Sequence, residues 1–498
     1  MKGGGLGLEI DRLANHPIYR QIIDAIIEKI EAGRLPPGTR LPTVRDLSQE
    51  LSVARVTVHK AYGDLQDRGY TDSTVGRGTF VLTPPESGKV DAAELFAVPA
   101  TPEMFLSSAP WVTRSRRTLS MEIAEPDPAF YPAQEFTRIL HSLARDATSL
   151  FGYSCPRGEP ALRYQIAALL GERGIDAGPE DLLITSGSTQ GLSLLIHALT
   201  QPGDKVLVEE PAYFGLLALL HTRNIQPVTV PVDDDGPDIE ALRRIMVRDR
   251  PRFFYTMSRF QNPKGISMSR RRRDEVLELA ERFGLLLIED DIFHPLAYDG
   301  EHPPPLKTDD RNDLVVYLDS FSKTLLPGLR IGYLLAPPPL RDRLAMLLQV
   351  DTMGNPPLLQ HALAEYLRRG QYAEHLRRVI PQYRERRDAT LDALQRSLPG
   401  GTTWTKPRGG YCCWVTLPAG GMFDDLRRAA LQQGVAYTPG EVFLTRPDDR
   451  THLRLCFGGV KPRAIREAID TIGKLVCERM ECRPAPSRSG LAKAAPLV

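Results

Sequence analysis

Short apolar runs alternate with amphipathic or loop-like segments from about residue 119 onward, and this alternation constrains the fold most strongly. The runs are DLLIT, DKVLVEE, RFFYTM, GLLLIED, DLVVYLDS and IGYLLAP. Strands separated by helical segments typically form a largely parallel sheet. Long helical patterns after about residue 350 precede two more short runs, GYCCWVTL and HLRLCFG. The sequence therefore predicts an α/β domain over 119–476, with a large mostly parallel sheet and a small α+β subdomain.

A separate small unit is predicted before that domain, over residues 11–82. Ile18, Ile22, Ile26 and Ile30 recur every four residues, which indicates a helix with one buried face. A short helical segment, the turn SVA and a second helical segment follow, and this order is typical of a helix-turn-helix. The next residues, YTDSTVGRGTFVL, predict two short strands that form a wing.

The segments outside these two units have the composition of connecting chain. Residues 83–118 are rich in Pro, Ser and Ala and have no lasting period, which indicates a linker. Residues 477–498 are polar and contain proline, which indicates a flexible tail.

Composition narrows the class of protein. The 498 residues carry a net charge of +1, so only a local basic patch could bind nucleic acid. No apolar run approaches the roughly 20 residues of a membrane span, and the first residues lack the apolar core of a signal peptide. Six scattered cysteines without metal-type spacing favour reduced thiols and no metal site. We therefore expect a cytoplasmic protein.

The second helical segment of the small unit carries residues that could contact DNA. In a helix-turn-helix, the start of the second helix enters the major groove. Arg55 could read guanine or bind a phosphate there, and Thr57 and His59 share its outward face. Arg45 on the preceding segment and Arg77 in the wing could contact the DNA backbone. From charge alone, a solvated helix face explains these residues equally well.

The order of residues in this unit is more specific than its charge. RLPTVRDLSQELSVARVTVHKAYGDLQDRGYTDSTVGRGTFV resembles the winged helix-turn-helix of the GntR family of bacterial regulators. Ala54 departs from that family, which often has a serine at this position. The resemblance implies double-stranded DNA as a partner, contacted by Arg45, Arg55, Thr57, His59 and Gly76.

Lys323, in SFSKTLLPGLRIG, is a candidate cofactor lysine. It follows an apolar run and would lie past the carboxyl end of that strand, where open α/β sheets bind ligands. A lysine with a lowered pKa can form a Schiff base with an aldehyde cofactor. Ser320, Ser322 and Arg330 could bind a phosphate beside it. Alone, this short motif is weak support for a cofactor site.

Other predicted strand ends supply what a phosphorylated pyridine aldehyde would need. Ser188 and Thr189 begin a helix, a position suited to a phosphate. One acid of Glu289–Asp291 could bind the ring nitrogen, because a run of acids at a strand end has no other evident stabilising role. Tyr213 could stack on the ring, and Asn262 could bind the ring hydroxyl.

FQNPKG, EDDIF and SFSKTLLPGLRIGY, in this order, resemble a fold-type I aminotransferase, from about Ile123 to Gly473. The resemblance implies pyridoxal 5'-phosphate as cofactor, with Lys323 as the internal aldimine lysine and Asp290 on the pyridine nitrogen. It assigns the other cofactor contacts to Asn262, Tyr213, Ser188, Thr189, Ser320, Ser322, Arg330 and Tyr153.

Two further residues carry implications from the same resemblance, and one position departs from it. Tyr153 matches a tyrosine that reaches the phosphate of the neighbouring subunit, which implies a homodimer. Arg454 matches the arginine that binds the substrate α-carboxylate. Relatives usually have a tyrosine two or three residues after the ring aspartate, where this chain has Ile292 and Phe293. A phenyl ring cannot donate a hydrogen bond, which argues against efficient transamination.

A GntR-type reader followed by an aminotransferase-like domain resembles the MocR subfamily of bacterial transcription regulators. The resemblance implies a pyridoxal phosphate-dependent regulator that binds a DNA operator and senses an amino acid or amine effector through the aldimine at Lys323. Two alternatives stay open. One is a catalytically active aminotransferase, a transferase with an accessory DNA-binding module, and the other is a repressor that senses the cofactor itself.

Overall fold

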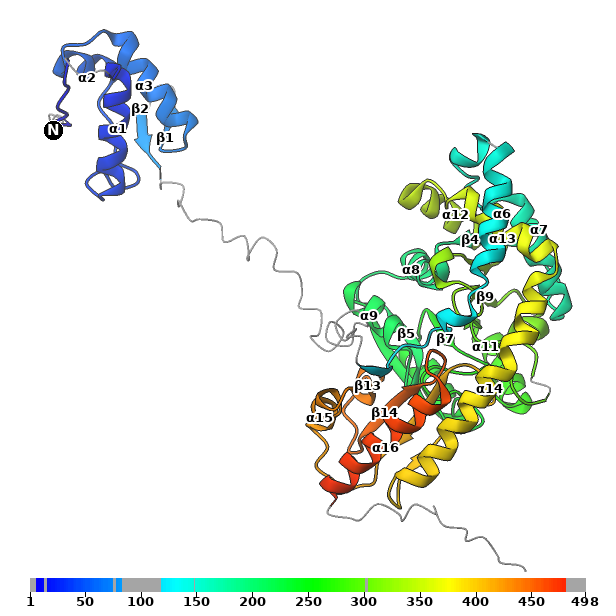
Figure 1. Ribbon diagram of the computed structural model, residues 1–498. Coiled ribbons are helices and arrows are strands. Elements are labelled where there is room, and N and C mark those ends of the chain that lie inside the picture. The colour runs from blue at the N-terminus through cyan, green and yellow to red at the C-terminus, as the bar shows by residue number, and fades with distance from the viewer. Residues whose placement is uncertain are drawn as a thin grey trace, which may run out of the picture. The chain divides into compact units, whose positions relative to one another are not determined.

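The protein divides into two compact units, Met1–Val98 and Pro99–Val498. The computed structural model describes residues 6–12, 16–74, 78–82, 118–146, 148–300 and 303–480 (Figure 1). Almost all of the predicted linker and tail therefore lies outside the described residues. The last helix, α16, continues through Cys477 to Arg479, within the first residues of the predicted tail.

The N-terminal unit is a winged helix-turn-helix (Figure 1). Its elements are α1 (Ile18–Glu31), α2 (Val44–Glu50), α3 (Arg55–Asp67), β1 (Thr71–Thr74) and β2 (Gly78–Val81). The isoleucine period places Ile22, Ile26 and Ile30 in a core shared with α2 and α3. Thr43 caps α2 by accepting a hydrogen bond from the Asp46 amide at 3.1 Å, which fixes where α2 begins after the turn.

A seven-stranded sheet forms the centre of the second unit, in the order β4-β10-β9-β8-β7-β5-β6. Only β10 runs against its neighbours β4 and β9, and the other adjacent strands are parallel. The predicted α/β class with a mostly parallel sheet is thus confirmed. The strands are β4 (Leu182–Thr185), β5 (Lys205–Glu210), β6 (Gln226–Pro231), β7 (Phe253–Thr256), β8 (Leu286–Asp290), β9 (Val315–Ser320) and β10 (Gly332–Leu335).

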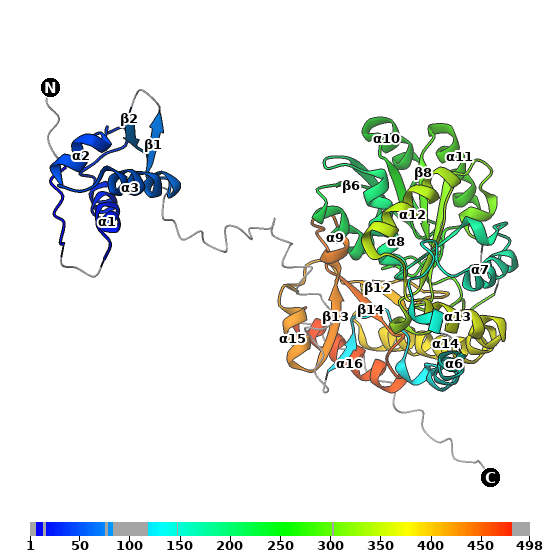
Figure 2. The same ribbon diagram turned by 90° about the horizontal axis from the view of Figure 1, so that it is seen from above.

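Helices cover both faces of this sheet (Figures 1 and 2). One face packs on α8 (Gly187–Leu199), α9 (Phe214–Thr222) and α12 (Pro338–Thr352). The other face is covered in two halves, by α7 and α13 over β4, β9 and β10, and by α10 and α11 over β5 to β8. The bounds of these helices are α7 (Pro160–Glu172), α10 (Ile239–Asp249), α11 (Arg270–Phe283) and α13 (Pro357–Arg368), and a neighbouring helix is α6 (Ala133–Asp146). Burial on both faces explains why the strand runs are continuously apolar.

The small subdomain contains a five-stranded sheet in the order β11-β12-β14-β13-β3. Its last strand, β3, comes from the start of the domain and pairs in parallel with β13, so the subdomain is assembled from both ends of the unit. The strands are β3 (Leu119–Met121), β11 (Thr403–Trp404), β12 (Cys412–Thr416), β13 (Val435–Pro439) and β14 (His452–Cys456), and the helices are α14 (Gln371–Ser397), α15 (Leu426–Gln432) and α16 (Pro462–Arg479).

None of the helices in the described ranges combines the length and the apolar character that a membrane span requires.

Candidate cofactor and DNA-binding sites

Side chains that follow four parallel strands meet at one edge of the large sheet. Because β5, β7, β8 and β9 run in the same direction, their carboxyl ends lie at the same edge. Tyr213, Asn262, Asp290 and Lys323 lie at or just after these four ends, in that order. Burial raises the pKa of Tyr213, and the charge of Asp290 raises it further.

The three acids at the end of β8 have different surroundings. Glu289 accepts hydrogen bonds from the amides of Leu306 and Lys307 at 2.7 and 3.0 Å. Asp291 faces the buried guanidinium of Arg259, whose Nε donates to it at 2.9 Å. The expectation that such acids have no stabilising role is therefore wrong for these two residues. They are fully occupied by the protein itself, which leaves Asp290 as the acid available to a ligand.

Asp290 is buried and only half satisfied. Its Oδ2 accepts a hydrogen bond from the Tyr255 hydroxyl at 2.7 Å. Its Oδ1 is buried and has no hydrogen-bond partner among the described residues. Burial raises the pKa of Asp290 to about 7, because a low-dielectric site disfavours the carboxylate. A cationic ring nitrogen would reverse that preference and would satisfy the free oxygen.

This pKa predicts a pH-dependent effect of Asp290→Asn on the cofactor-free protein. The raised pKa means that the stability contribution of the protonated carboxyl is present below about pH 4 and is lost as pH rises through about 7. At pH 8 the free energy of unfolding of the variant should exceed that of the wild type by on the order of 1–3 kcal/mol. Its urea midpoint should therefore be higher. At pH 4 the two proteins should be alike. Equal urea midpoints at pH 8 would contradict this environment for Asp290.

Lys323 is half-buried and points back into the protein. Its Nζ donates a hydrogen bond to the Ala124 carbonyl at 2.8 Å, and its own carbonyl accepts from the Tyr411 hydroxyl at 2.7 Å. Burial lowers the pKa of Lys323, and the charge of Arg454 lowers it further. A lysine whose neutral amine is favoured in this way is suited to attack an aldehyde.

The amino-terminal end of α8 faces Arg330. Ser188 and Thr189 lie in the first turn of this helix, whose N-cap side chain leaves the first amides uncapped. Gly187 has a φ of +76°, and a Cβ there would lie 2.7 Å from the Arg330 guanidinium. Arg330 donates to the Ser186 carbonyl at 3.0 Å. A helix start, a glycine and an exposed arginine are a combination that could bind a phosphate.

The two serines before Lys323 are already bonded to each other. Ser320 Oγ donates toward the Ile331 carbonyl and toward Ser322 Oγ, both at 3.1 Å, and accepts from the Ser322 amide at 3.2 Å. Ser320 therefore fixes the turn that carries Lys323. The Ser322 hydroxyl keeps its hydrogen for a ligand.

Arg454 is buried against the small subdomain and connects to Asn262. Its Nη1 donates to Asn262 Oδ1 at 3.0 Å, and its Nη2 donates to the Thr438 hydroxyl at 3.0 Å and to the Glu122 carbonyl. Its Nε is buried without a partner among the described residues. The ring of Phe443 packs on the guanidinium at 4.7 Å. This preformed cation has a donor left for a carboxylate.

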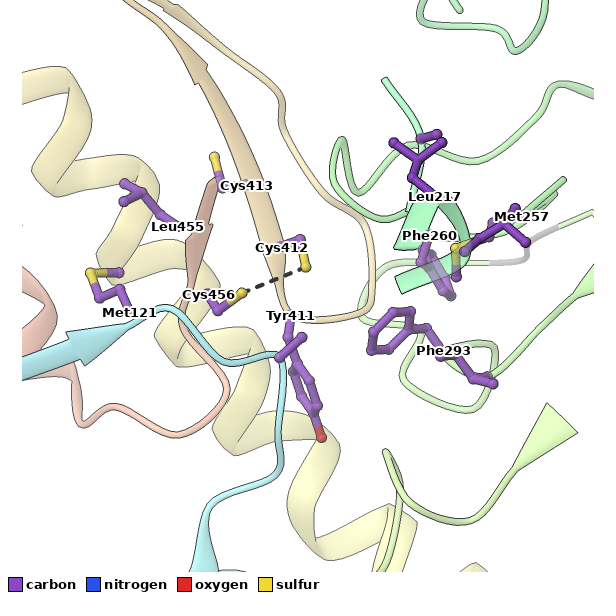
Figure 3. Close-up of a cluster of buried hydrophobic side chains, with 14 of the residues drawn as sticks. Met121, Leu217, Met257, Phe260, Phe293, Tyr411, Cys412, Cys413, Leu455 and Cys456 are labelled. Atoms are coloured by element: carbon purple, nitrogen blue, oxygen red, sulfur yellow. Dashed lines mark hydrogen bonds between the residues drawn. The ribbon is translucent and has the colours of Figure 1, made fainter. Parts of the chain in front are cut away.

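Phe293 occupies the place where a hydroxyl was expected. It is almost fully buried, and its ring meets that of Tyr411 edge to face, with the centroids 5.8 Å apart (Figure 3). The hydroxyl of Tyr411, the ring that Phe293 contacts, donates to the Lys323 carbonyl. The described residues thus supply a purely apolar group at the position of Phe293.

Two features lie apart from this site. Tyr153 is 84% exposed and makes no contact with Lys323 or Asp290 among the described interactions. A cavity of about 960 Å³ is lined by Lys264, Trp404 and Trp414, among others, and by none of the predicted cofactor residues. The strand-end residues predicted to bind the cofactor therefore do not line this cavity.

The start of α3 presents a free polar face. Arg45, Arg55 and His59 are exposed, and none of their side chains has a hydrogen-bond or ion-pair partner among the described residues. Thr57 is half-buried. Val56, which the sequence analysis did not single out, is 74% exposed and could contact a thymine methyl group. The remaining predicted contacts, Gly76 and Arg77, lie outside the described residues.

Comparisons with known proteins match both units. Residues 18–81 match the family of bacterial regulatory proteins of the gntR type, and residues 127–472 match the aminotransferase class I and II family. The uncharacterized HTH-type transcriptional regulator YdcR of Escherichia coli is 30% identical over 93% of this chain and 99% of its own length. The probable rhizopine catabolism regulatory protein MocR of Rhizobium meliloti is 31% identical, over 93% and 95%.

The chain belongs to the MocR subfamily of GntR-family transcription regulators. The fold of its larger unit is shared with solved enzymes. The α-aminoadipate aminotransferase LysN of Thermus thermophilus, complexed with N-(5'-phosphopyridoxyl)-L-leucine, is 31% identical. It covers 79% of this regulator and 100% of its own chain, with a TM-score of 0.72.

The residues of this MocR-type regulator fit pyridoxal phosphate. The unpartnered buried oxygen of Asp290 suits the ring nitrogen, and Gly187 with Arg330 leaves room and charge for the phosphate. Sequence reasoning missed Tyr255, which orients Asp290, and Tyr411, which anchors the Lys323 backbone. Both lie within apolar runs of the sequence, and only their hydrogen bonds in the folded protein reveal these roles.

Proposed function

We propose that this regulator carries pyridoxal 5'-phosphate at Lys323 and changes its binding to an operator when an amino acid or amine effector reaches that site. The observation that supports this most directly is the half-satisfied buried Asp290 at the same sheet edge as the half-buried Lys323. The cofactor supplies an aldehyde that reacts with primary amines, together with a ring that withdraws electrons when its nitrogen is protonated.

Each side chain has a defined role in this proposal. Asp290, oriented by Tyr255, keeps the ring nitrogen protonated, and Tyr213 covers one face of the ring. Asn262 donates to the ring hydroxyl, because its Oδ1 is occupied by Arg454. Arg454 binds the effector carboxylate. The phosphate contacts are assigned to Ser188, Thr189, Ser320, Ser322 and Arg330, with Tyr153 from the partner of a homodimer.

Lys323 is the group whose state an effector changes. Lys323 would hold the cofactor through its Nζ, and the freed amine would donate to the Ala124 carbonyl, as it does in this structure. Different contacts in the two states can bias the positions of the DNA-binding units, because a ligand shifts an equilibrium only by its differential affinity for the states. A spectral titration of the cofactor-loaded protein with an amino-acid library tests this step. The absence of any absorbance change would contradict the proposal that the protein senses an effector at this site.

Phenylalanine at position 293, in place of the expected tyrosine, favours sensing over turnover. Restoring the tyrosine should therefore increase transamination. Phe293→Tyr places a hydroxyl donor at the expected position and should raise single-turnover transamination by about 10- to 100-fold. Conversion of amino acid with 2-oxoglutarate measures the effect, and Phe293→Leu serves as a control without a hydroxyl. Fast multiple turnovers by the wild type would instead favour the alternative, an active aminotransferase with an accessory DNA-binding module.

Arg55 is expected to carry much of the operator affinity. Arg55→Ala should weaken binding to DNA from upstream of the regulator's own gene by about 1–3 kcal/mol, roughly 5- to 150-fold. Arg68 is an exposed arginine at the opposite end of the same helix, so Arg68→Ala is the matched control and should leave affinity nearly unchanged. Fluorescence anisotropy of a labelled duplex measures both variants. Equal losses would point to general charge instead of groove contact.

A further inference from the structure

Two buried cysteines face each other across the central strands of the small sheet. Cys412 on β12 and Cys456 on β14 are directly paired in the antiparallel register, and their sulfur atoms are 3.8 Å apart (Figure 3). The two cysteines look scattered in the sequence, because they lie 44 positions apart in the chain.

The pair has the backbone placement that a disulfide needs. Directly opposite residues of antiparallel strands have Cα atoms about 4.5–5.5 Å apart, and disulfides form across Cα separations of about 4.4–6.8 Å. The sulfur atoms need to close from 3.8 Å to about 2.05 Å. Side-chain rotation can supply this movement without a shift of the strands.

The two thiols also lie in the cofactor site. Cys412 Sγ is 3.7 Å from Asn262 Oδ1 and 3.8 Å from Cys456 Sγ, so its one S–H can donate to either atom. Burial acts to raise the pKa of Cys456, but the contact with the Cys412 thiol and the positive charges of Arg454 and Lys323 outweigh it, so the net shift is downward. A thiolate is the reactive form of cysteine, and nearby cations favour it.

Cys413 provides an internal contrast. It is the next residue of the same strand and is equally buried, but it points away from the pair (Figure 3). Its thiol donates to the Thr405 carbonyl at 3.3 Å, and burial raises its pKa to about 12. Burial alone would make a cysteine inert, so the reactivity of the pair depends on its cationic neighbours and on the second thiol.

We propose that Cys412 and Cys456 form a redox-modification site, at which a hydroperoxide oxidises the two thiols to a disulfide. The Cys456 thiolate attacks the distal peroxide oxygen, the O–O bond breaks, and an alcohol or water leaves after taking up a proton. The resulting sulfenic acid is attacked by Cys412 sulfur, which releases one water and forms the S–S bond. The two thiols lose two electrons, and the peroxide gains them.

The disulfide would act on the effector site. It withdraws Cys412 sulfur from Asn262 and ties β12 to β14, the strand that carries Arg454. We therefore expect oxidised protein to bind an amino-acid effector with an affinity changed by at least about threefold. This consequence rests on the proposed function, whereas the formation of the disulfide does not.

The test treats the full-length protein with hydrogen peroxide, blocks free thiols and identifies cross-linked peptides by mass. We expect one intrachain link between the peptides of Cys412 and Cys456, reversed by dithiothreitol. Cys413→Ser should keep the link, and Cys456→Ser should abolish it. Because wild-type peptides already report the bond, a variant that fails to fold leaves the result intact.

Two outcomes would overturn the proposal in different ways. If Cys412 and Cys456 stay free while the exposed Cys155 is oxidised, the modification site does not exist. If the disulfide forms but amino-acid titrations of oxidised and reduced protein coincide, the coupling to the effector site is wrong. Failure of every amino acid to change the spectrum, with the disulfide still present, would count against the proposed function alone.

Discussion

Lys323→Ala should abolish the visible absorbance of bound cofactor and every spectral response to amino acids. The alanine has no amine to join the cofactor aldehyde, so attachment is limited to the noncovalent contacts of the ring and the phosphate. Gel filtration followed by an absorbance scan measures retention of the cofactor. We expect full loss of the band from the variant under conditions in which the wild type keeps it.

A matched control separates this effect from general loss of charge. Lys406 is an exposed lysine of the same unit, and it lies outside the assigned site, so Lys406→Ala should keep the band. Operator binding by cofactor-free Lys323→Ala should match that of cofactor-free wild type, because the N-terminal unit has its own core. Retention of an unchanged spectrum by Lys323→Ala would disprove the assigned attachment point.

Arg454→Ala should weaken the binding of amino-acid effectors by about 2–4 kcal/mol, roughly 30- to 900-fold. The guanidinium is preformed by Asn262, Thr438 and the Glu122 carbonyl, so its loss removes the carboxylate partner together with its geometry. The measurement is the half-saturation concentration in the spectral titration. Circular dichroism checks that the variant, which loses a buried network, remains folded.

The chemistry of the effector provides the control for Arg454. An amine without a carboxylate should have the same half-saturation concentration with the wild type and with Arg454→Ala, because it has no group that binds this arginine. Arg454→Lys keeps the charge but not the planar guanidinium, and its affinity for amino acids should lie between those of the wild type and Arg454→Ala. If amines and amino acids lose affinity equally, Arg454 supports the fold of the site and does not bind a carboxylate.

Strong local patterns made most of this architecture predictable. The apolar runs of the buried strands located β4, β5 and β7 to β10, because burial on both faces leaves few polar positions. The four-residue spacing of the isoleucines located α1, because it marks the buried face of a helix. The edge strand β6 was missed, because its residues QPVTVP include two prolines and have little burial. The short β3 was missed because its pairing with β13 is entirely long-range.

The candidate site was predictable in its members but not in their connections. The sequence could not decide between three consecutive acids on physical grounds, since that depends on which neighbours each one meets. Arg259 and the amide of Leu306 occupy Asp291 and Glu289, and only the fold brings these partners together. The Cys412–Cys456 pair was invisible for the same reason, because strand register across β12 and β14 creates it.

The most direct test of the central claim measures operator affinity and cofactor state in one sample. A labelled operator duplex is titrated with cofactor-loaded wild type, with and without an amino acid that changes its spectrum. Our account predicts that the dissociation constant for DNA changes by about 5- to 150-fold, and that Lys323→Ala shows no change. Identical DNA affinity at full spectral conversion would contradict the claim that the cofactor site controls the DNA-binding unit.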